Sequence, residues 1–423
     1  MSLVSAAPIR LGLRANWKQF SLLVVVNAFV GSMVGMERTL LPLLGRDVFG
    51  IESRAAILSF LISFGVVKAI SNAAAGRFAD VQGRKRVLVA GWLAGIPVPF
   101  LLMFAPPPHW WLVVLANVFL GVNQGLCWSM TVLSKIDLAG PRSRGLAMGL
   151  NEFAGYAAVG ATALLTGYAA AVYGIRPIPF AVGVVAVAAG LSLSAVAVRE
   201  TKPYADLEQG AGSEAVPFRA TFAEATWRNH SLFACSQGGL VNNLNDGVAW
   251  GLLPLFLAAR GLGTEAIGWI AGLYPLTWGV LQLVTGPASD ALGRKPLLVA
   301  GMLLQSGAFA SFVYGDGLLA WSGASLLLGF GTAMVYPTFL SAVGDHAAPS
   351  VRGATVGVYR FWRDLGFAIG AVVVGLYADA RGLDAALVLT GLLTFASGII
   401  ILVALIESHG SESSSPARDL RRP

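Results

Sequence analysis

Eight charged side chains lie inside stretches of the sequence that are otherwise almost entirely apolar. Acids and bases occur in equal numbers among them: Glu37, Arg38, Lys68, Glu152, Asp246, Arg360, Arg363 and Asp364. A charged side chain in hydrocarbon costs at least about 2.5 kcal/mol, so it is normally kept for a relay, a transport pathway or a partner. These residues are therefore the first place to look for chemistry.

Asp246 is the residue best suited to carry a proton. It lies about eleven residues before Leu257, near the end of its apolar stretch, which corresponds to roughly 17 Å of helix and to the middle of a membrane. Desolvation at that depth disfavours the charged form of a carboxyl group, as a proton carrier requires. We predict that Asp246 is the proton-coupling residue, with Glu152 and Glu37 as reserves because a basic residue can pair with each.

Polar and aromatic residues recur at helical spacing beside these charges. Asn242, Asp246 and Trp250 are four residues apart, so they share one face of a helix. Glu37 and Arg38 are neighbours about 100° apart on a helix, so both cannot face one cavity and the pair can neutralise itself locally. Asn and Gln side chains in these stretches either bind a solute or only join helices by hydrogen bonds.

The whole chain has the composition of a membrane protein. Hydrophobic residues make up 56% of the 423 residues and charged residues 12%, whereas about 25% of residues are charged in soluble domains. Twelve apolar stretches are long enough, at about twenty residues each, to cross a bilayer as helices. We therefore predict an all-α membrane protein with twelve transmembrane helices.

Basic residues predict the orientation in the membrane. Lys and Arg concentrate in segments on the side of the amino terminus, among them 76–86, 135–144 and 199–228, and few lie on the opposite side. Because cytoplasmic loops carry the excess of Lys and Arg, we predict that both termini are cytoplasmic and that the chain lies in the inner (plasma) membrane. Topology thus accounts for the net charge of +7, and no nucleic acid partner is expected.

One charged motif occurs twice. The segments "GRFADVQGRKR" at 76–86 and "GPASDALGRKP" at 286–296 match at an offset of 210 residues, and two further blocks match at offsets of 212 and 208. We infer two copies of one six-helix bundle, at 1–198 and 231–406, joined by a cytoplasmic linker at 199–230 and followed by a disordered tail at 407–423. The matched residues are Gly76, Asp80, Gly83, Arg84 and Lys85 in the first copy, and Gly286, Asp290, Gly293, Arg294 and Lys295 in the second.

This motif resembles the signature of the major facilitator superfamily, G-x-x-x-D-x-x-G-R-K/R, in the loop between helices 2 and 3. Its second copy falls in the equivalent loop between helices 8 and 9. The resemblance implies two pseudo-symmetric bundles, alternating access, and a cytoplasmic gate made by these loops. Asp80 is expected to accept a hydrogen bond from Arg84 and to face the start of a helix near Gly353 in the other half.

The resemblance also implies roles for residues inside the spans. Helices 2 and 11 face each other, so a pair of Lys68 with Asp364, or of Asp364 with Arg360, is either structural and gating or part of the substrate site. Arg363 belongs to the same group of buried charges. Helices 1, 4, 7 and 10 line the cavity, which gives these substrate-binding candidates: Arg38, Asn117, Gln124, Trp128, Asn242, Trp250 and Tyr336.

The sequence lacks the motifs of other functional classes. The sequence has no G-x-S-x-G, no H-E-x-x-H and no phosphate-binding G-x-x-x-x-G-K-[ST], so we expect neither an enzyme nor ATP-driven transport, and no cofactor or metal. We predict a monomeric secondary transporter of a small organic solute, coupled to protons or another ion, with export favoured by the lack of sugar-porter motifs. The alternatives are a gradient-coupled importer of an organic anion or sugar, and a receptor with a transporter fold.

Overall fold

The computed structural model describes residues 11–139, 144–208, 218–347 and 351–407. These residues form helices joined by short connections, and no strand occurs within these ranges. Within the described residues, eleven helical segments are long and apolar enough to cross a membrane. The remaining span begins with α12 (His230–Gly251). This helix is unusually polar because it contains three Asn residues and Asp246. The expected all-α fold of twelve spans is confirmed.

The first half contains six spans, several of them interrupted by a short break. Pro42 and Pro97 lie at or next to the first residue after a break, where a missing N–H is tolerated. The helices are α1 (Leu13–Arg38), α2 (Leu41–Asp47), α3 (Arg54–Ile57), α4 (Ser59–Gln82), α5 (Arg84–Gly95), α6 (Pro97–Phe104), α7 (Trp111–Ala139), α8 (Arg144–Tyr173), η2 (Ile178–Phe180) and α9 (Ala181–Val196).

The second half repeats this plan. The break at Pro42 recurs at Pro254, and Gly83 and Gly293 turn the chain with φ of +91° and +93°, a conformation that favours glycine. Its helices are α12, α13 (Leu253–Ala259), α14 (Thr264–Leu292), α15 (Arg294–Tyr314), α16 (Gly317–His346), α17 (Arg352–Arg381) and α18 (Leu383–Ala404).

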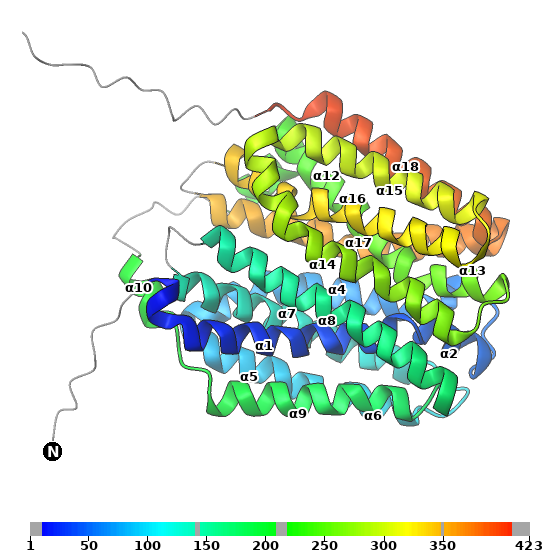
Figure 1. The fold of residues 1–423 in the computed structure, drawn as a ribbon. Helices are drawn as coiled ribbons and strands as arrows, with labels where there is room; N and C mark the ends of the chain where they lie inside the picture. Colours follow the sequence, from blue (N-terminus) through cyan, green and yellow to red (C-terminus); the bar gives the residue numbers. More distant parts are fainter. Residues whose placement is uncertain (1–10, 140–143, 209–217, 348–350, 408–423) are drawn as a thin grey trace, which may run out of the picture.

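The predicted linker starts at the same end of the bundle as the first span (Figure 1). It contains α10 (Lys202–Glu208), α11 (Phe218–Ala223) and η3 (Glu224–Arg228). Its residues 209–217, and 408–423 of the predicted disordered tail, lie outside the described residues. We call the end with Leu11, α10 and Glu407 the terminal face, and the opposite end, with α2 and α13, the distal face.

Lys135 corrects one expectation. It was assigned to a loop on the side of the termini, but it lies inside α7 with a side chain that is 0% exposed. A residue four positions from the end of a long helix can still lie inside the bundle, because α7 continues to Ala139 before the chain turns. Lys135 is therefore a ninth charged residue within the spans.

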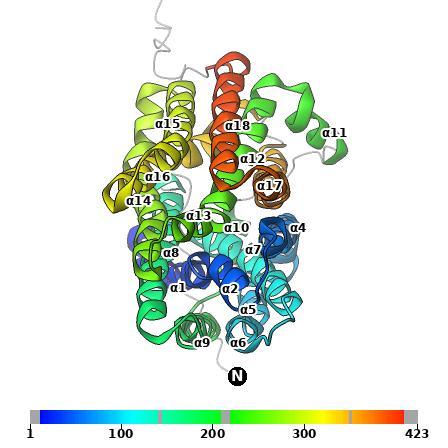
Figure 2. The ribbon, with the colours of Figure 1, turned by 90° about the vertical axis from the view of Figure 1, so that its right-hand side faces the viewer.

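The two halves meet along two pairs of helices. In Figure 2 the second half lies above the first, with α8 beside α14 and α4 beside α17. Glycines allow the first pair to approach closely: a Cβ atom at Gly160 would lie 2.7 Å from the carbonyl oxygen of Gly272. In the second pair, a Cβ at Gly65 would lie 2.8 Å from the Cβ of Phe367.

This close contact does not extend to the terminal face. A Cβ atom at Gly149, near the start of α8, would lie 4.0 Å from its nearest neighbour, a Leu283 methyl. A Cβ at Gly353 or Gly357, near the start of α17, would meet nothing within 4 Å among the described residues. The halves therefore pack tightly toward the distal face and loosely toward the terminal face.

Candidate functional site

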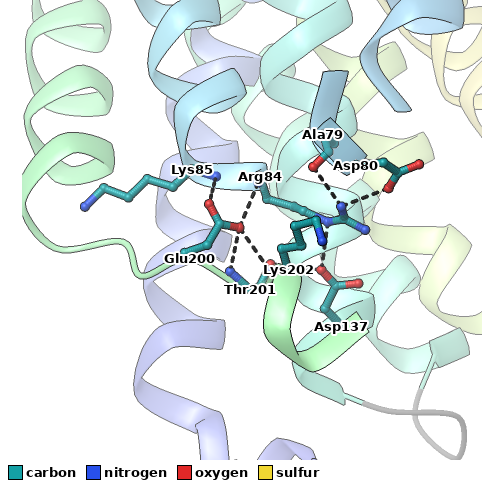
Figure 3. Close-up of polar contacts among 8 residues, drawn as sticks. All are labelled: Ala79, Asp80, Arg84, Lys85, Asp137, Glu200, Thr201 and Lys202. Atoms are coloured by element: carbon teal, nitrogen blue, oxygen red, sulfur yellow. Dashed lines mark hydrogen bonds and ion pairs between the residues drawn. The ribbon is translucent and has the colours of Figure 1, made fainter. Parts of the chain in front are cut away.

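Arg84 contacts several of the charged and polar groups in and around the first repeated motif (Figure 3). Its guanidinium lies 3.0 Å from the carboxylate of Asp80 and 3.2 Å from that of Asp137, and it donates to the backbone oxygen of Ala79. The predicted bond between Asp80 and Arg84 is confirmed. Asp137, on α7, was not predicted.

Glu200, at the start of the linker, belongs to the same group of contacts around Arg84, which we call the terminal-face network. Its carboxylate accepts the backbone N–H groups of Arg84 at 2.8 Å and Lys85 at 3.2 Å (Figure 3). These are free donors at the beginning of α5, where the helix dipole also favours an anion. The carboxylate further accepts from the backbone N–H of Thr201 and Lys202. The linker is thus attached to the first half.

The second half contains the same network. Arg294 lies 2.6 Å from Asp290 and 3.1 Å from Asp345, and Glu407 accepts the backbone N–H groups of Arg294 and Lys295, each at 2.8 Å. Every contact matches one in the first half at an offset of 207 to 210 residues. The duplication therefore includes the acidic caps.

Asp80 and Asp290 make these ion pairs within their own halves. Their side chains are 67% and 69% exposed. The expected approach of Asp80 to the helix start near Gly353 is not present in this conformation, because no contact between them occurs among the described residues. The loose packing of the terminal face accounts for this separation.

Glu37 and Arg38 form one of two charged clusters inside the bundle. Their side chains pair at 3.1 Å and are 0% and 1% exposed, as expected for a locally neutralised pair. Asn117, on α7, donates to the second oxygen of Glu37 at 3.2 Å. Arg38 Nε and Nη2 have no hydrogen-bond partner within the described ranges.

Aromatic rings enclose Arg38. Its guanidinium lies 4.6 Å from the ring centre of Phe64 and 4.7 Å from that of Trp250, distances typical of cation–π contacts. Trp250 stacks on Phe367, whose ring also lies 5.2 Å from the ammonium of Lys68. An aromatic layer from both halves thus separates Arg38 from Lys68.

The face of α12 expected to line a cavity instead contacts four different helices. Asp246 accepts a hydrogen bond from Tyr274 on α14, and Trp250 lies between Arg38 and Phe367. Asn242 Oδ1 accepts from Gln305 on α15 at 3.0 Å, a buried contact between helices. Asp246 is 1% exposed and has no ion pair within 4 Å in the described part of the chain.

The second cluster joins the two halves through α4 and α17. Asp364, 0% exposed, lies 3.6 Å from Lys68 and 2.8 Å from Arg363, and it also accepts from Asn72. The expected pair of Lys68 with Asp364 is confirmed, while the other partner of Asp364 is Arg363 rather than Arg360. Asn72 and Lys68 belong to the first half, so this carboxylate bridges both halves.

Glu152 provides a second polar connection between the halves. It accepts from Tyr336, on α16 of the second half, at 3.0 Å and from Trp128 at 2.9 Å. Tyr336 in turn accepts from Arg363 at 2.9 Å. Glu152 has no ion pair within 4 Å among the residues that the structure describes, and the amide of Asn151 lies between it and Lys135.

Gln124 has a contact that favours a structural role. Its side chain donates to the backbone oxygen of Val30 on α1 at 2.9 Å and to Asn123 at 3.0 Å, so it joins α7 to α1. Among the predicted binding residues, Trp128 and Tyr336 border a small cavity between the halves. They share it with Tyr156, whose ring stacks on Trp278 at 3.5 Å.

The distal face is closed by a contact between halves that the sequence did not reveal. Asp379, near the end of α17, accepts from the Ser53 hydroxyl at 2.7 Å and from the backbone N–H groups of Arg54 and Ala55 at 2.6 and 3.1 Å. Its carboxylate also lies 3.9 Å from the Arg54 guanidinium. We call this set of four residues the distal clasp.

The arrangement joins the two halves through hydrogen bonds and ion pairs between polar side chains. Titratable groups from both halves meet in the membrane interior, and each contact between halves can be made or broken as they move. No group of three or more potential metal ligands occurs in the part of the chain that the structure describes.

The chain belongs to the major facilitator superfamily. The model of that family, described as "Major Facilitator Superfamily", matches twice, over residues 20–244 and 236–423. The two matches agree with the duplication found in the sequence and in the terminal-face networks. This is a family of transporters, and the protein is a multi-pass membrane protein.

Individual relatives are distant. The uncharacterized MFS-type transporter YhhS of Escherichia coli O157:H7 is 24% identical over 395 residues, which cover 89% of this chain and 90% of the relative. The multidrug resistance protein MdtH of Aeromonas hydrophila is 28% identical over 116 residues, 26% of this chain. That match spans 29% of the length of MdtH.

Solved structures share the fold. The human organic anion transporter MFSD10 (TETRAN) superposes with a TM-score of 0.66 at 18% identity, covering 91% of this chain and 99% of that one. A POT family transporter in complex with 5-aminolevulinic acid gives a TM-score of 0.72 at 13% identity, with coverage of 92% and 96%. At these identities the likeness concerns the fold alone.

Proposed function

We propose that this protein is a monomeric secondary transporter that exports a small organic solute across the inner membrane in exchange for protons. The observation that carries the proposal is the polar chain across the halves, from Glu152 through Tyr336, Arg363 and Asp364 to Lys68. Such a chain ties the two halves together in the membrane interior, and its rearrangement accompanies alternating access. We place the terminal face in the cytoplasm, following the distribution of basic residues.

Asp246 is the proposed proton-coupling residue. It is buried without an ion pair in the described part of the chain, whereas Glu37 is held by Arg38 and Glu152 joins the halves. For a buried carboxyl group without a cationic partner, the protonated form costs less free energy than the charged form. Proton uptake and release at this position therefore accompany reorientation.

The test uses the full-length protein in proteoliposomes with an imposed pH gradient and an enclosed pH-sensitive dye. Tetraphenylphosphonium and benzoate serve as first probes of organic cations and anions, within a wider panel of organic solutes. We expect at least one solute to accumulate against its gradient with a matching proton flux, to an extent that protein-free liposomes do not show. We expect Asp246→Asn to abolish accumulation and to retain exchange. Accumulation that still follows the pH gradient in this variant refutes the role of Asp246, and a panel without any proton-linked movement refutes transport.

A further inference from the structure

A small cavity between the halves is lined by bases and aromatic rings. Its volume is about 10 Å³ in this conformation, enough for roughly one water molecule. Three cationic side chains border it, Lys68, Arg360 and Arg363, and none of the described residues that line it carries a carboxylate. Its aromatic walls are Trp128, Tyr156 and Tyr336.

The three cations differ in their partners. Lys68 and Arg363 lie 3.6 and 2.8 Å from the carboxylate of Asp364, so one buried anion serves both. Arg360 has no ion pair in the described part of the chain, and its Nε is buried without a hydrogen-bond acceptor. Of the five donors of this guanidinium, the Nε–H is the one buried without an acceptor, and such an unpaired buried donor is costly. Arg360 therefore lacks the anion that each of its neighbours has.

Arg360 also lies on the side of the cavity from which a solute can arrive. It is about one helical turn closer to the terminal face than Arg363 and Asp364. Around the start of α17, a Cβ atom at Gly357 would meet none of the described residues within 4 Å, whereas the packing toward the distal face is tight. A solute entering between the halves from the terminal face meets Arg360 before it meets Arg363 and Asp364.

We infer that this cavity, once enlarged by separation of the halves, binds an organic anion with an aromatic or apolar body. The inference deepens the proposed function and rests on it. The acidic group of the solute pairs with Arg360, since guanidinium and carboxylate form two parallel hydrogen bonds. Its apolar body packs on the rings of Trp128, Tyr156 and Tyr336. A cationic solute would instead face three positive charges.

The test compares three ligands that share a naphthalene ring and carry a negative, a neutral or a positive group on it: 2-naphthoate, 2-naphthylmethanol and 2-naphthylmethylammonium. Binding to the purified full-length protein in detergent is measured by calorimetry. We expect the carboxylate to bind at least about tenfold more tightly than the alcohol, and the ammonium ion most weakly. Tightest binding of the ammonium ion, equal binding of all three, or no binding of the carboxylate at about millimolar concentration overturns the inference.

Two variants assign the effect to one residue. Arg360→Gln is expected to remove the advantage of the carboxylate over the alcohol, and Arg360→Lys to restore part of it. Arg381→Gln is the matched control, because Arg381 is exposed at the distal end of the same helix. Unchanged carboxylate affinity in Arg360→Gln refutes the assignment. If that variant fails to fold, the ranking of the three ligands on the unmodified protein decides the inference.

The inference and the proposed function fail in different ways. Movement of the ammonium ion with a proton flux would support transport and refute the anion site. Binding of the carboxylate that depends on Arg360, without proton-linked movement of any solute in the panel, would support the anion site and refute coupled transport.

Discussion

Removing the carboxylate of Asp379 is expected to open the distal face. Asp379→Ala deletes an acceptor of two backbone N–H groups and one hydroxyl at the start of α3, in the opposite half. Replacing such a capping side chain with Ala costs about 0.5 to 2 kcal/mol. The ion pair with Arg54 adds little, because the Arg54 side chain is 42% exposed. A loss of about 1 to 2 kcal/mol shifts the balance between distal-closed and distal-open states by roughly 5- to 30-fold.

The assay follows the distance between two labels on the distal face, one in each half. His109→Cys and Asp316→Cys provide exposed attachment sites, while the native Cys127 and Cys235 are buried. Single-molecule fluorescence transfer then reports the distal-open fraction without knowledge of the solute. We expect this fraction to rise in the Asp379→Ala variant.

A second acidic residue on the same face serves as the control. Asp384 pairs with Arg260, and both belong to the second half, so Asp384→Ala removes an ion pair that does not join the halves. We expect no change in the label distances for this variant. Identical distance distributions for Asp379→Ala and the unmodified protein, or equal shifts in both variants, would show that the distal clasp does not hold the halves together.

Two further predictions concern the terminal face and the packing between halves. Asp80→Asn should reduce the transport rate strongly while expression stays unchanged. Asp290→Asn should reduce it less, since the second motif has Pro296 in place of a third basic residue. Equal losses of transport rate in uptake assays would show that the two loops are equivalent. Gly160→Ala should destabilise the protein by about 1 to 3 kcal/mol through overpacking against α14. Gly307→Ala, where a Cβ meets nothing within 4 Å, is the control; equal melting temperatures in detergent would contradict the packing argument.

Repetition in the sequence predicted much of the fold. Matching glycines, acids and bases at constant offsets indicated two copies, and the structure repeats even the break at Pro42 and Pro254. The same comparison could have found Glu200 and Glu407, which are 207 residues apart and each cap a helix. The sequence comparison missed them because they lie outside the repeated motif. Their equivalence is recognised only from the structure, in which they bind the equivalent residues Arg84 and Arg294.

The partners of the buried charges were less predictable. The family resemblance, in which helices 2 and 11 face each other, gave Lys68 and Asp364 as one of two expected pairs, and this pair is present. Helical spacing placed Asn242 and Asp246 on one face, but their side chains diverge to Gln305 and Tyr274 on different helices. Spacing defines a direction around one helix. Which neighbour lies in that direction depends on crossing angles that sequence spacing does not contain.

The two acidic caps also indicate how the chain can be divided. Glu200 and Glu407 each close the terminal face of the half that precedes them, using backbone groups of that half alone. Neither half depends on the other for this network. Two polypeptides separated within the linker, after Glu208 and before Phe218, would each retain their own cap. Reassembly of the transporter would then depend on the contacts between α8 and α14, and between α4 and α17, without covalent continuity.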